Sequence, residues 1–113
     1  MTFTTTQHGS VSVIGVEGNL MGGPDASALN GKLHELVEAG ITKVVLDLRG
    51  VQFMNSSGLG LMIGGASTLK SAGGGLKLAN ASEKIMALIK ITKLESLFDN
   101  YSSVEEAVAG FRT

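Results

Sequence analysis

The chain has 113 residues, enough for one domain with its own core and too few for two. Hydrophobic residues make up 43% and charged residues 17%, a composition typical of a globular chain rather than a disordered one. The formal net charge at pH 7 is −1, and no run of like charges occurs. Composition therefore gives no electrostatic reason to expect a nucleic acid or an anionic membrane as partner, and we expect a single domain over residues 1–113.

Cysteine is absent, which excludes disulfides and leaves only histidine and carboxylate groups as metal ligands. The two histidines, His8 and His34, have no spacing that suggests shared ligation, so we expect no metal and no other cofactor. The N-terminal residues lack the basic start and apolar stretch of a signal peptide, and no apolar run approaches the ~20 residues that cross a bilayer. We therefore expect a cytoplasmic protein that does not insert into a membrane.

The first half of the chain alternates extended and helical patterns. Pro24 suits the first turn of a helix, where its missing N–H costs nothing, and Gly40 supplies a stop. The apolar residues between them recur at helical spacing: Ala26, Leu29, Leu33, Leu36 and Val37. Short β-branched runs on either side predict strands. The expected elements are an edge strand over 3–7, a strand over 11–16, a loop over 17–23, a helix over 24–39 and a strand over 44–48.

The second half continues the alternation. A helix over 57–72 is expected to be capped by Ser56 or Ser57, and a triplet of glycines ends it. Its apolar set is Leu59, Met62, Ile63, Ala66 and Leu69. Residues 103–106 read as a capping box before a last helix. The other expected elements are a strand over 76–79, a helix from Ser82 with Ile85, Leu88 and Ile89, a short strand or extended segment over 97–98, and the last helix with Val104, Ala107, Val108 and Phe111.

This order of elements predicts an α/β fold. Strands that alternate with helices imply a largely parallel sheet with helices packed on it. The hairpin expected at the N-terminal end adds an antiparallel strand, so the sheet should be mixed.

Polar residues concentrate at one strand-to-helix junction, between Asp47 and Gly60. Asn55, Ser56 and Ser57 can satisfy the free N–H groups at the start of the following helix, and this capping role is one interpretation of them. The same position also suits a phosphate, because a helix N-terminus carries partial positive charge. A serine there can gain about two negative charges without unfolding its own domain. Ser56 is therefore also a candidate phosphoacceptor.

Catalytic sites are not indicated. A hydrolase nucleophile elbow has glycine two residues before and after its serine, whereas Asn55 and Leu59 hold these positions around Ser57. Asp47 could in principle be a general base or a metal ligand, but a lone carboxylate near serines more often accepts hydrogen bonds that fix a loop. We interpret Asp47 as loop-fixing and expect that the chain is not an enzyme.

Nucleotide-binding loops are not indicated either. Gly58, Gly60 and Gly64 follow a dinucleotide-binding pattern with one residue too many, and Asn80 stands where that pattern needs an acidic residue. No P-loop occurs. The glycines are better explained by close packing of a helix on a sheet.

The segment around Ser56 resembles the STAS domain family, the fold of bacterial anti-sigma-factor antagonists. That family usually has aspartate-serine-serine-glycine-leucine at this junction, and its first serine, the phosphoacceptor, corresponds to Ser56. Asn55 replaces the usual aspartate, which keeps the capping capacity but removes a carboxylate that bears on recognition by a kinase. The matching residues are Val45-Leu46-Asp47-Leu48, Val51, Phe53-Met54 and Asn55-Ser56-Ser57-Gly58-Leu59-Gly60, with Gly18-Asn19-Leu20 upstream.

The resemblance implies one STAS domain over residues 1–113 and a partner-switching function. The unphosphorylated protein would bind an anti-sigma factor with serine-kinase activity, that kinase would phosphorylate Ser56, and a PP2C-type phosphatase would reset it. Supporting residues for the switch are expected at Asp47, Asn55, Ser57 and Gly58. The apolar residues expected at the partner surface are Met21, Met54 and Leu59, methionine being suited to adaptable contacts.

Two other functions remain open at this point. Some STAS domains have structural roles in stress-signalling scaffolds or lipid-transport complexes, and a weak nucleotide or small-ligand binder is a third interpretation. The sequence identifies neither the sigma factor nor the kinase.

Overall fold

The computed structural model describes residues 2–21 and 23–111, with the side chain of Ala26 outside the described part. Within these residues one five-stranded sheet has the strand order β1-β2-β3-β4-β5. β1 is antiparallel to β2, and every other neighbouring pair is parallel. This mixed, mostly parallel sheet confirms the predicted α/β fold. The strands are β1 (Thr2–His8), β2 (Val11–Glu17), β3 (Lys43–Gly50), β4 (Gly75–Ala79) and β5 (Asn100–Tyr101).

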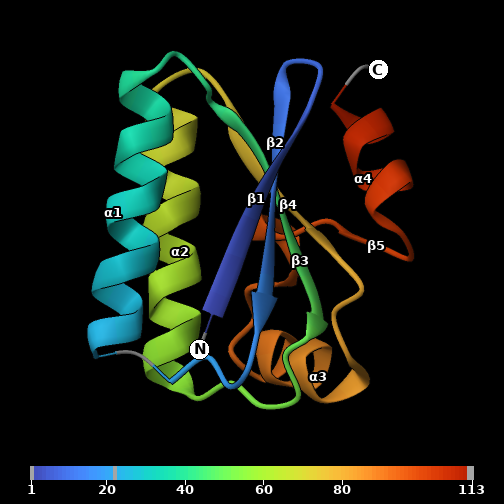
Figure 1. Cartoon of the computed structure of the whole chain (residues 1–113). Helices are drawn as coiled ribbons and strands as arrows, with labels where there is room; N and C mark the ends of the chain where they lie inside the picture. Colours follow the sequence, from blue (N-terminus) through green and yellow to red (C-terminus); the bar gives the residue numbers. More distant parts are fainter. Residues whose placement is uncertain (1, 22, 112–113) are drawn as a thin grey trace.

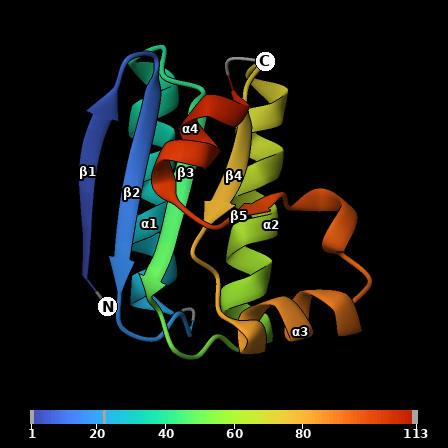
Figure 2. The same ribbon diagram turned by 90° about the vertical axis from the view of Figure 1, so that its right-hand side faces the viewer.

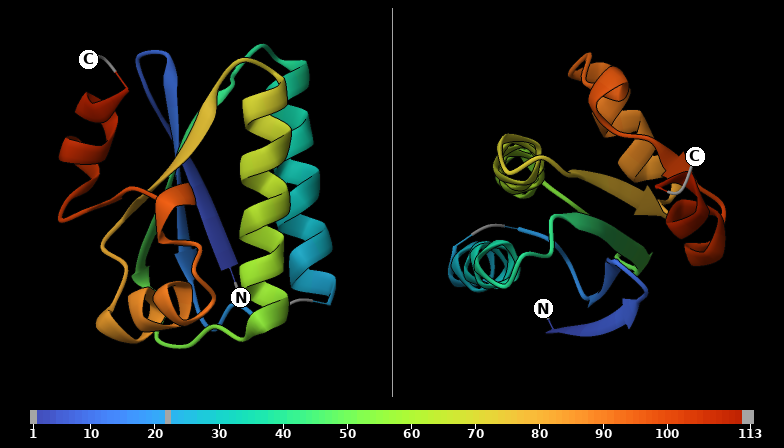
Figure 3. Two further views of the ribbon diagram at one scale, coloured as in Figure 1. Left: turned by 180° about the vertical axis from the view of Figure 1, so that it is seen from behind. Right: turned by 90° about the horizontal axis from the view of Figure 1, so that it is seen from above.

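Helices cover both faces of the sheet. α1 (Pro24–Glu38) and α2 (Ser56–Ser71) lie side by side on one face, and α4 (Val104–Gly110) lies on the other (Figures 1 and 3). α3 (Glu83–Ile91) lies at the end of the sheet where β3 stops, next to the N-terminus of α2 (Figure 2). A 3₁₀ helix, η1 (Glu95–Leu97), connects α3 to β5. No helix in the described ranges is long and apolar enough to span a membrane.

Two hydrophobic clusters follow from the alternation of side chains along the strands. Every second residue of β2, β3 and β4 faces α1, α2 and α3, and the residues between them face α4. The first cluster includes Ile14, Leu46, Leu78, Leu33, Met62 and Ile85, and the second includes Val13, Val45, Ala79, Ala107 and Val108. β3 is therefore covered on both faces, as its continuous apolar run predicts.

Of the two alternatives expected for residues 97–98, the strand is wrong, whereas the extended backbone is found at Phe98. Residues up to Leu97 belong to η1, and the short edge strand lies three residues later, at Asn100–Tyr101. The reason is that the Phe98 side chain is buried in the helix-facing cluster, which anchors the chain before it joins the sheet. The first bond to the sheet then comes from Leu78 N, which donates to Asp99 O at 2.9 Å.

Ile63 is half-buried and packs against the helix-facing cluster, beside the buried Leu59, Met62 and Leu69 of α2. One further expectation needs correction: the capping box before α4 is only half formed. Ser103 Oγ accepts from Glu106 N at 3.1 Å as expected, but the Glu106 carboxylate accepts from Ser102 Oγ at 2.8 Å.

Candidate partner-binding site

The start of α2 is fixed by Asn55 rather than by a serine. The Asn55 backbone is extended, and its Oδ1 accepts a hydrogen bond from Gly58 N at 2.8 Å. Asparagine is a strong N-cap because its side chain reaches the third residue of the helix. The expectation that Ser56 or Ser57 caps this helix is therefore wrong. Both serines are exposed, and neither hydroxyl has a hydrogen-bond partner within residues 2–21 and 23–111.

The loop after β2 lies directly against this helix start. Leu20 N donates to Phe53 O at 3.0 Å, and Asn55 N donates to Leu20 O at 3.4 Å. A Cβ at Gly58 would collide with Leu20 O, so only glycine allows the two segments to approach this closely. The neighbouring Met21 is 43% exposed. The loop therefore brings Met21 to the same end of the domain as the two serines.

Two of the three residues expected at the partner surface are in the core. Met54 is 5% exposed and Leu59 is 2% exposed, so only Met21 of the expected set is a surface residue. Leu59 faces the sheet from the first turn of α2, and Met54 pairs with Leu20 in a short parallel bridge that directs its side chain inward. The preceding residue, Phe53, is 50% exposed, and the sequence interpretation missed it. Successive side chains of an extended segment point in opposite directions, so an inward Met54 implies an outward Phe53, and this alternation could have identified it.

Phe53 and Ser56 line a groove that α3 completes. Its volume is about 660 Å³, within the range of ligand pockets. Its lining contains one cation, Lys84, and no histidine or carboxylate, so the groove offers apolar contact rather than acid–base chemistry. The apolar residues of the lining are Phe53, Met54, Ile85, Ala87, Leu88 and Ile91, and the polar ones are Asn55, Ser56 and Lys84.

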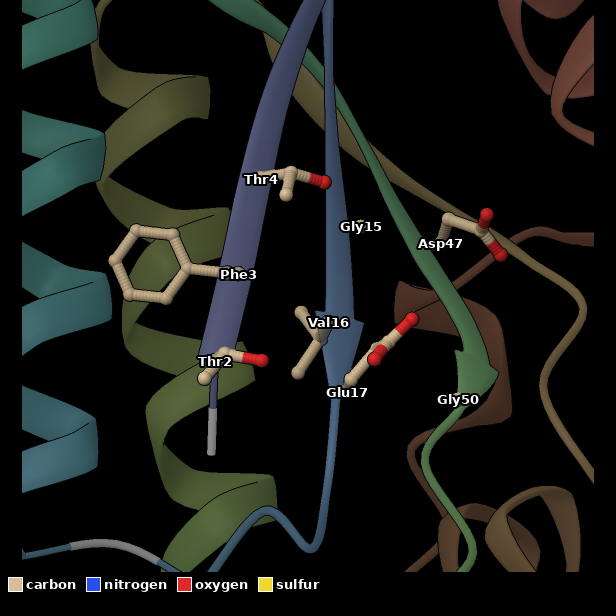
Figure 4. Close-up of a pocket in the computed structure, with 8 residues that line it drawn as sticks. All are labelled: Thr2, Phe3, Thr4, Gly15, Val16, Glu17, Asp47 and Gly50. Atoms are coloured by element: carbon tan, nitrogen blue, oxygen red, sulfur yellow. The ribbon is translucent and has the colours of Figure 1, made fainter.

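Asp47 lies apart from this groove. Its Oδ1 accepts from Arg49 N at 3.1 Å and from Asn80 Nδ2 at 3.0 Å, which connects the ends of β3 and β4. These contacts fit the loop-fixing interpretation. Asp47 also lines a separate cavity of about 160 Å³, where it and Glu17 point away from α1 and α2 while Phe3 points toward them (Figure 4). Asp47 therefore supports the strand ends and does not share the groove with Ser56.

Metal ions require a set of donor side chains brought together in space. The described residues contain no group of three or more histidine, cysteine, aspartate or glutamate side chains that could hold a metal ion.

A model of the STAS domain matches residues 2–107. The chain belongs to the STAS domain family. This STAS domain is 37% identical over 83 residues to the anti-sigma-B factor antagonist of Bacillus subtilis (strain 168), an alignment that covers 74% of this chain and 75% of that protein. The family resemblance drawn from residues 45–60 is thereby confirmed.

Solved structures show the same fold. The Thermotoga maritima protein TM1081 superposes with a TM-score of 0.89 at 22% identity, covering 98% of this chain and 95% of that one. Unphosphorylated SpoIIAA, an anti-sigma factor antagonist, gives a TM-score of 0.83 at 22% identity and covers 98% and 96%. The phosphorylated form of SpoIIAA from Bacillus gives 0.75 at 23% identity and covers 96% and 97%.

Proposed function

We propose that this STAS domain is an anti-sigma-factor antagonist, a regulatory binding protein of the bacterial cytoplasm with no catalytic activity of its own. The relative from Bacillus subtilis, at 37% identity, has that function in its name. The observation that carries the proposal is the exposed Ser56 at the start of α2, on the rim of an apolar groove. The Ser56 hydroxyl is exposed and has no hydrogen-bond partner among residues 2–21 and 23–111, so it is available to a partner enzyme.

The switch is a phosphoryl transfer to Ser56. A partner anti-sigma factor with serine-kinase activity binds the unphosphorylated domain and presents ATP. The Ser56 oxygen forms a bond to the γ-phosphorus, the bond to ADP breaks, and a base on the kinase takes the hydroxyl proton. A PP2C-type phosphatase later hydrolyses the phosphoserine. SpoIIAA has been solved in a phosphorylated form, so the fold accommodates such a state.

The position of Ser56 explains how the phosphate could act without unfolding the domain. The first N–H groups of a helix have no intrahelical acceptor, and they tolerate a nearby anion. The rim of the groove, by contrast, is where a partner's apolar side chain would be desolvated. A dianion at this rim would have to lose water on binding, which is costly for an unpaired charge. The fold would survive while partner affinity falls.

Binding to the kinase-type anti-sigma factor of the same organism tests this proposal. Phe53→Lys should weaken binding by about tenfold or more, because it places a charge at an apolar contact. Leu97→Lys is the matched control, since Leu97 has the same exposure of 50% but lies on η1 and does not line the groove. Isothermal titration calorimetry on both variants gives the affinities. Equal affinity for wild type and Phe53→Lys would remove the groove from the interface, and capture of transporter or scaffold subunits instead would favour a structural role.

A further inference from the structure

Lys84 places a positive charge in the first turn of α3, where it does not stabilise the helix. α3 is capped by Ser82, whose Oγ accepts from Ile85 N at 3.2 Å, so Lys84 lies in the first turn. A cation there opposes the helix dipole, which favours the acidic Glu83 beside it. No carboxylate in residues 2–21 and 23–111 forms an ion pair with Lys84. Residues that are unfavourable for their own helix and have no stabilising partner are common at functional positions.

The groove brings Lys84 together with Ser56. Both side chains are exposed, and both line the same cavity, Ser56 from α2 and Lys84 from α3. The two helices are held in place, because Asn55 caps α2 and the buried Ile85 anchors α3 in the core. Lysine carries its charge on a flexible four-carbon stem. It can therefore follow a charge that develops at the rim of the groove.

We propose that Lys84 is the intramolecular counter-ion of phosphorylated Ser56, and that the ion pair between them closes the mouth of the groove. The proposal rests on the proposed phosphorylation of Ser56. The phosphate supplies about two negative charges and three acceptor oxygens, and the Lys84 ammonium is the one cation in the lining. In the unphosphorylated domain the groove stays open to an apolar side chain. Phosphorylation then acts twice, by adding charge for the partner to desolvate and by covering the apolar surface.

Phosphoserine placed at position 56 during translation tests the ion pair without any kinase. Phosphorus-31 NMR titration should give a lower phosphate pKa in the wild-type sequence than in Lys84→Met, by a few tenths of a unit, because a nearby cation favours the dianion. The difference should shrink in about 1 M salt, which screens exposed charges. Lys90→Met is the control, since Lys90 is exposed on the same helix but does not line the groove.

Closure of the groove is measured on the same proteins with the neutral dye N-phenyl-1-naphthylamine, which a phosphate does not repel. The dye should bind the unphosphorylated domain, bind the phosphorylated one severalfold more weakly, and recover its affinity in phosphorylated Lys84→Met. Thermal melts, with Lys84→Gln as a second variant, establish that each protein is folded. Equal phosphate pKa values in wild type and Lys84→Met, or equal dye binding by both phosphorylated proteins, would overturn the proposal. Because the phosphoserine is installed directly, failure of a kinase to modify Ser56 would refute the proposed function but not this ion pair.

Discussion

Asn55 holds the start of α2 through its hydrogen bond from Gly58 N, and it does so without a negative charge. The aspartate usual at this position would cap the helix equally well. It would also place a carboxylate next to Ser56, where it would repel a phosphate. The asparagine therefore caps α2 without placing a negative charge next to a phosphorylated Ser56.

Two glycines of α2 offer a matched test of how tightly this junction is packed. Gly58→Ala should lower the free energy of unfolding by about 1–3 kcal/mol, because its Cβ would collide with Leu20 O and force the β2–α1 loop away. Gly60→Ala should instead raise it by about 0.5–1 kcal/mol, since Gly60 has open space around it and alanine is the better helix former. Urea denaturation measures both. Similar values for the two variants would mean that the loop is not held against α2.

Among the helices and strands, those with strong local signals were predictable. Periodic apolar residues, Pro24 and the glycine stops placed α1, and the apolar run of β3 placed the central strand to within two residues at either end. The failures involve tertiary contacts. Phe98 leaves the expected strand because its side chain fills a core that no local pattern describes.

The candidate site was predictable only in part, for the same reason. Ser56 stands out in the sequence from its position at a strand-to-helix junction, and in the structure its side chain is exposed, while its phosphorylation stays a prediction. The sequence pattern does not predict the groove, because the groove forms only where α3 packs near residues 53–56. Leu59 is buried in the core, and Met54 is almost fully buried although it lines the groove. Apolar residues beside a polar junction look alike in the sequence whether they face inward or outward, and for Met54 the pairing with Leu20 decides the direction.

Lys77 of β4 adds side-chain contacts to the segments that hold β5 and α4 on the sheet. Its Nζ lies 3.1 Å from Asp99 Oδ2, 5.4 Å from the centre of the Tyr101 ring and 5.1 Å from that of Phe111. Burial lowers the pKa of Lys77, but interactions with Tyr101 and Asp99 raise it by more, so the pKa lies above the usual lysine value. The protonated form is thus favoured in the folded state.

This raised pKa predicts an alkaline loss of stability. A lysine whose pKa rises on folding stabilises the protein fully below its unfolded pKa of about 10.4, and the contribution disappears as the pH rises through the folded value. Lys77→Met should therefore be less stable than wild type by about 0.5–1 kcal/mol at pH 7, and the gap should narrow above pH ~10.4. Urea unfolding from neutral to alkaline pH measures it, with the exposed Lys90→Met as control. A gap that stays constant with pH would contradict the role of the Lys77 charge.

The arrangement of the complete domain explains why the site lies where it does. β2, β3 and β4 are parallel, so the loops that follow them meet at one end of the sheet. Those loops carry Met21, Phe53 with Ser56, and the start of α3, and the groove lies among them. Ligands of open α/β sheets bind at the carboxyl ends of the strands for the same topological reason. The sheet and the helices packed on it hold this end in place, and Met21, Phe53 and Ser56 are exposed there.

The site of modification is the decisive question, and mass spectrometry of the protein after incubation with its cognate kinase and ATP answers it. We predict phosphate on Ser56 and none on Ser57. Ser56→Ala should lose the label while still binding the kinase, because only a hydroxyl is removed and Asn55 remains the cap. Ser57→Ala should be labelled like wild type. Phosphate on Ser57 alone, or on neither serine while the kinase still binds, would contradict the assignment of Ser56 as the switch.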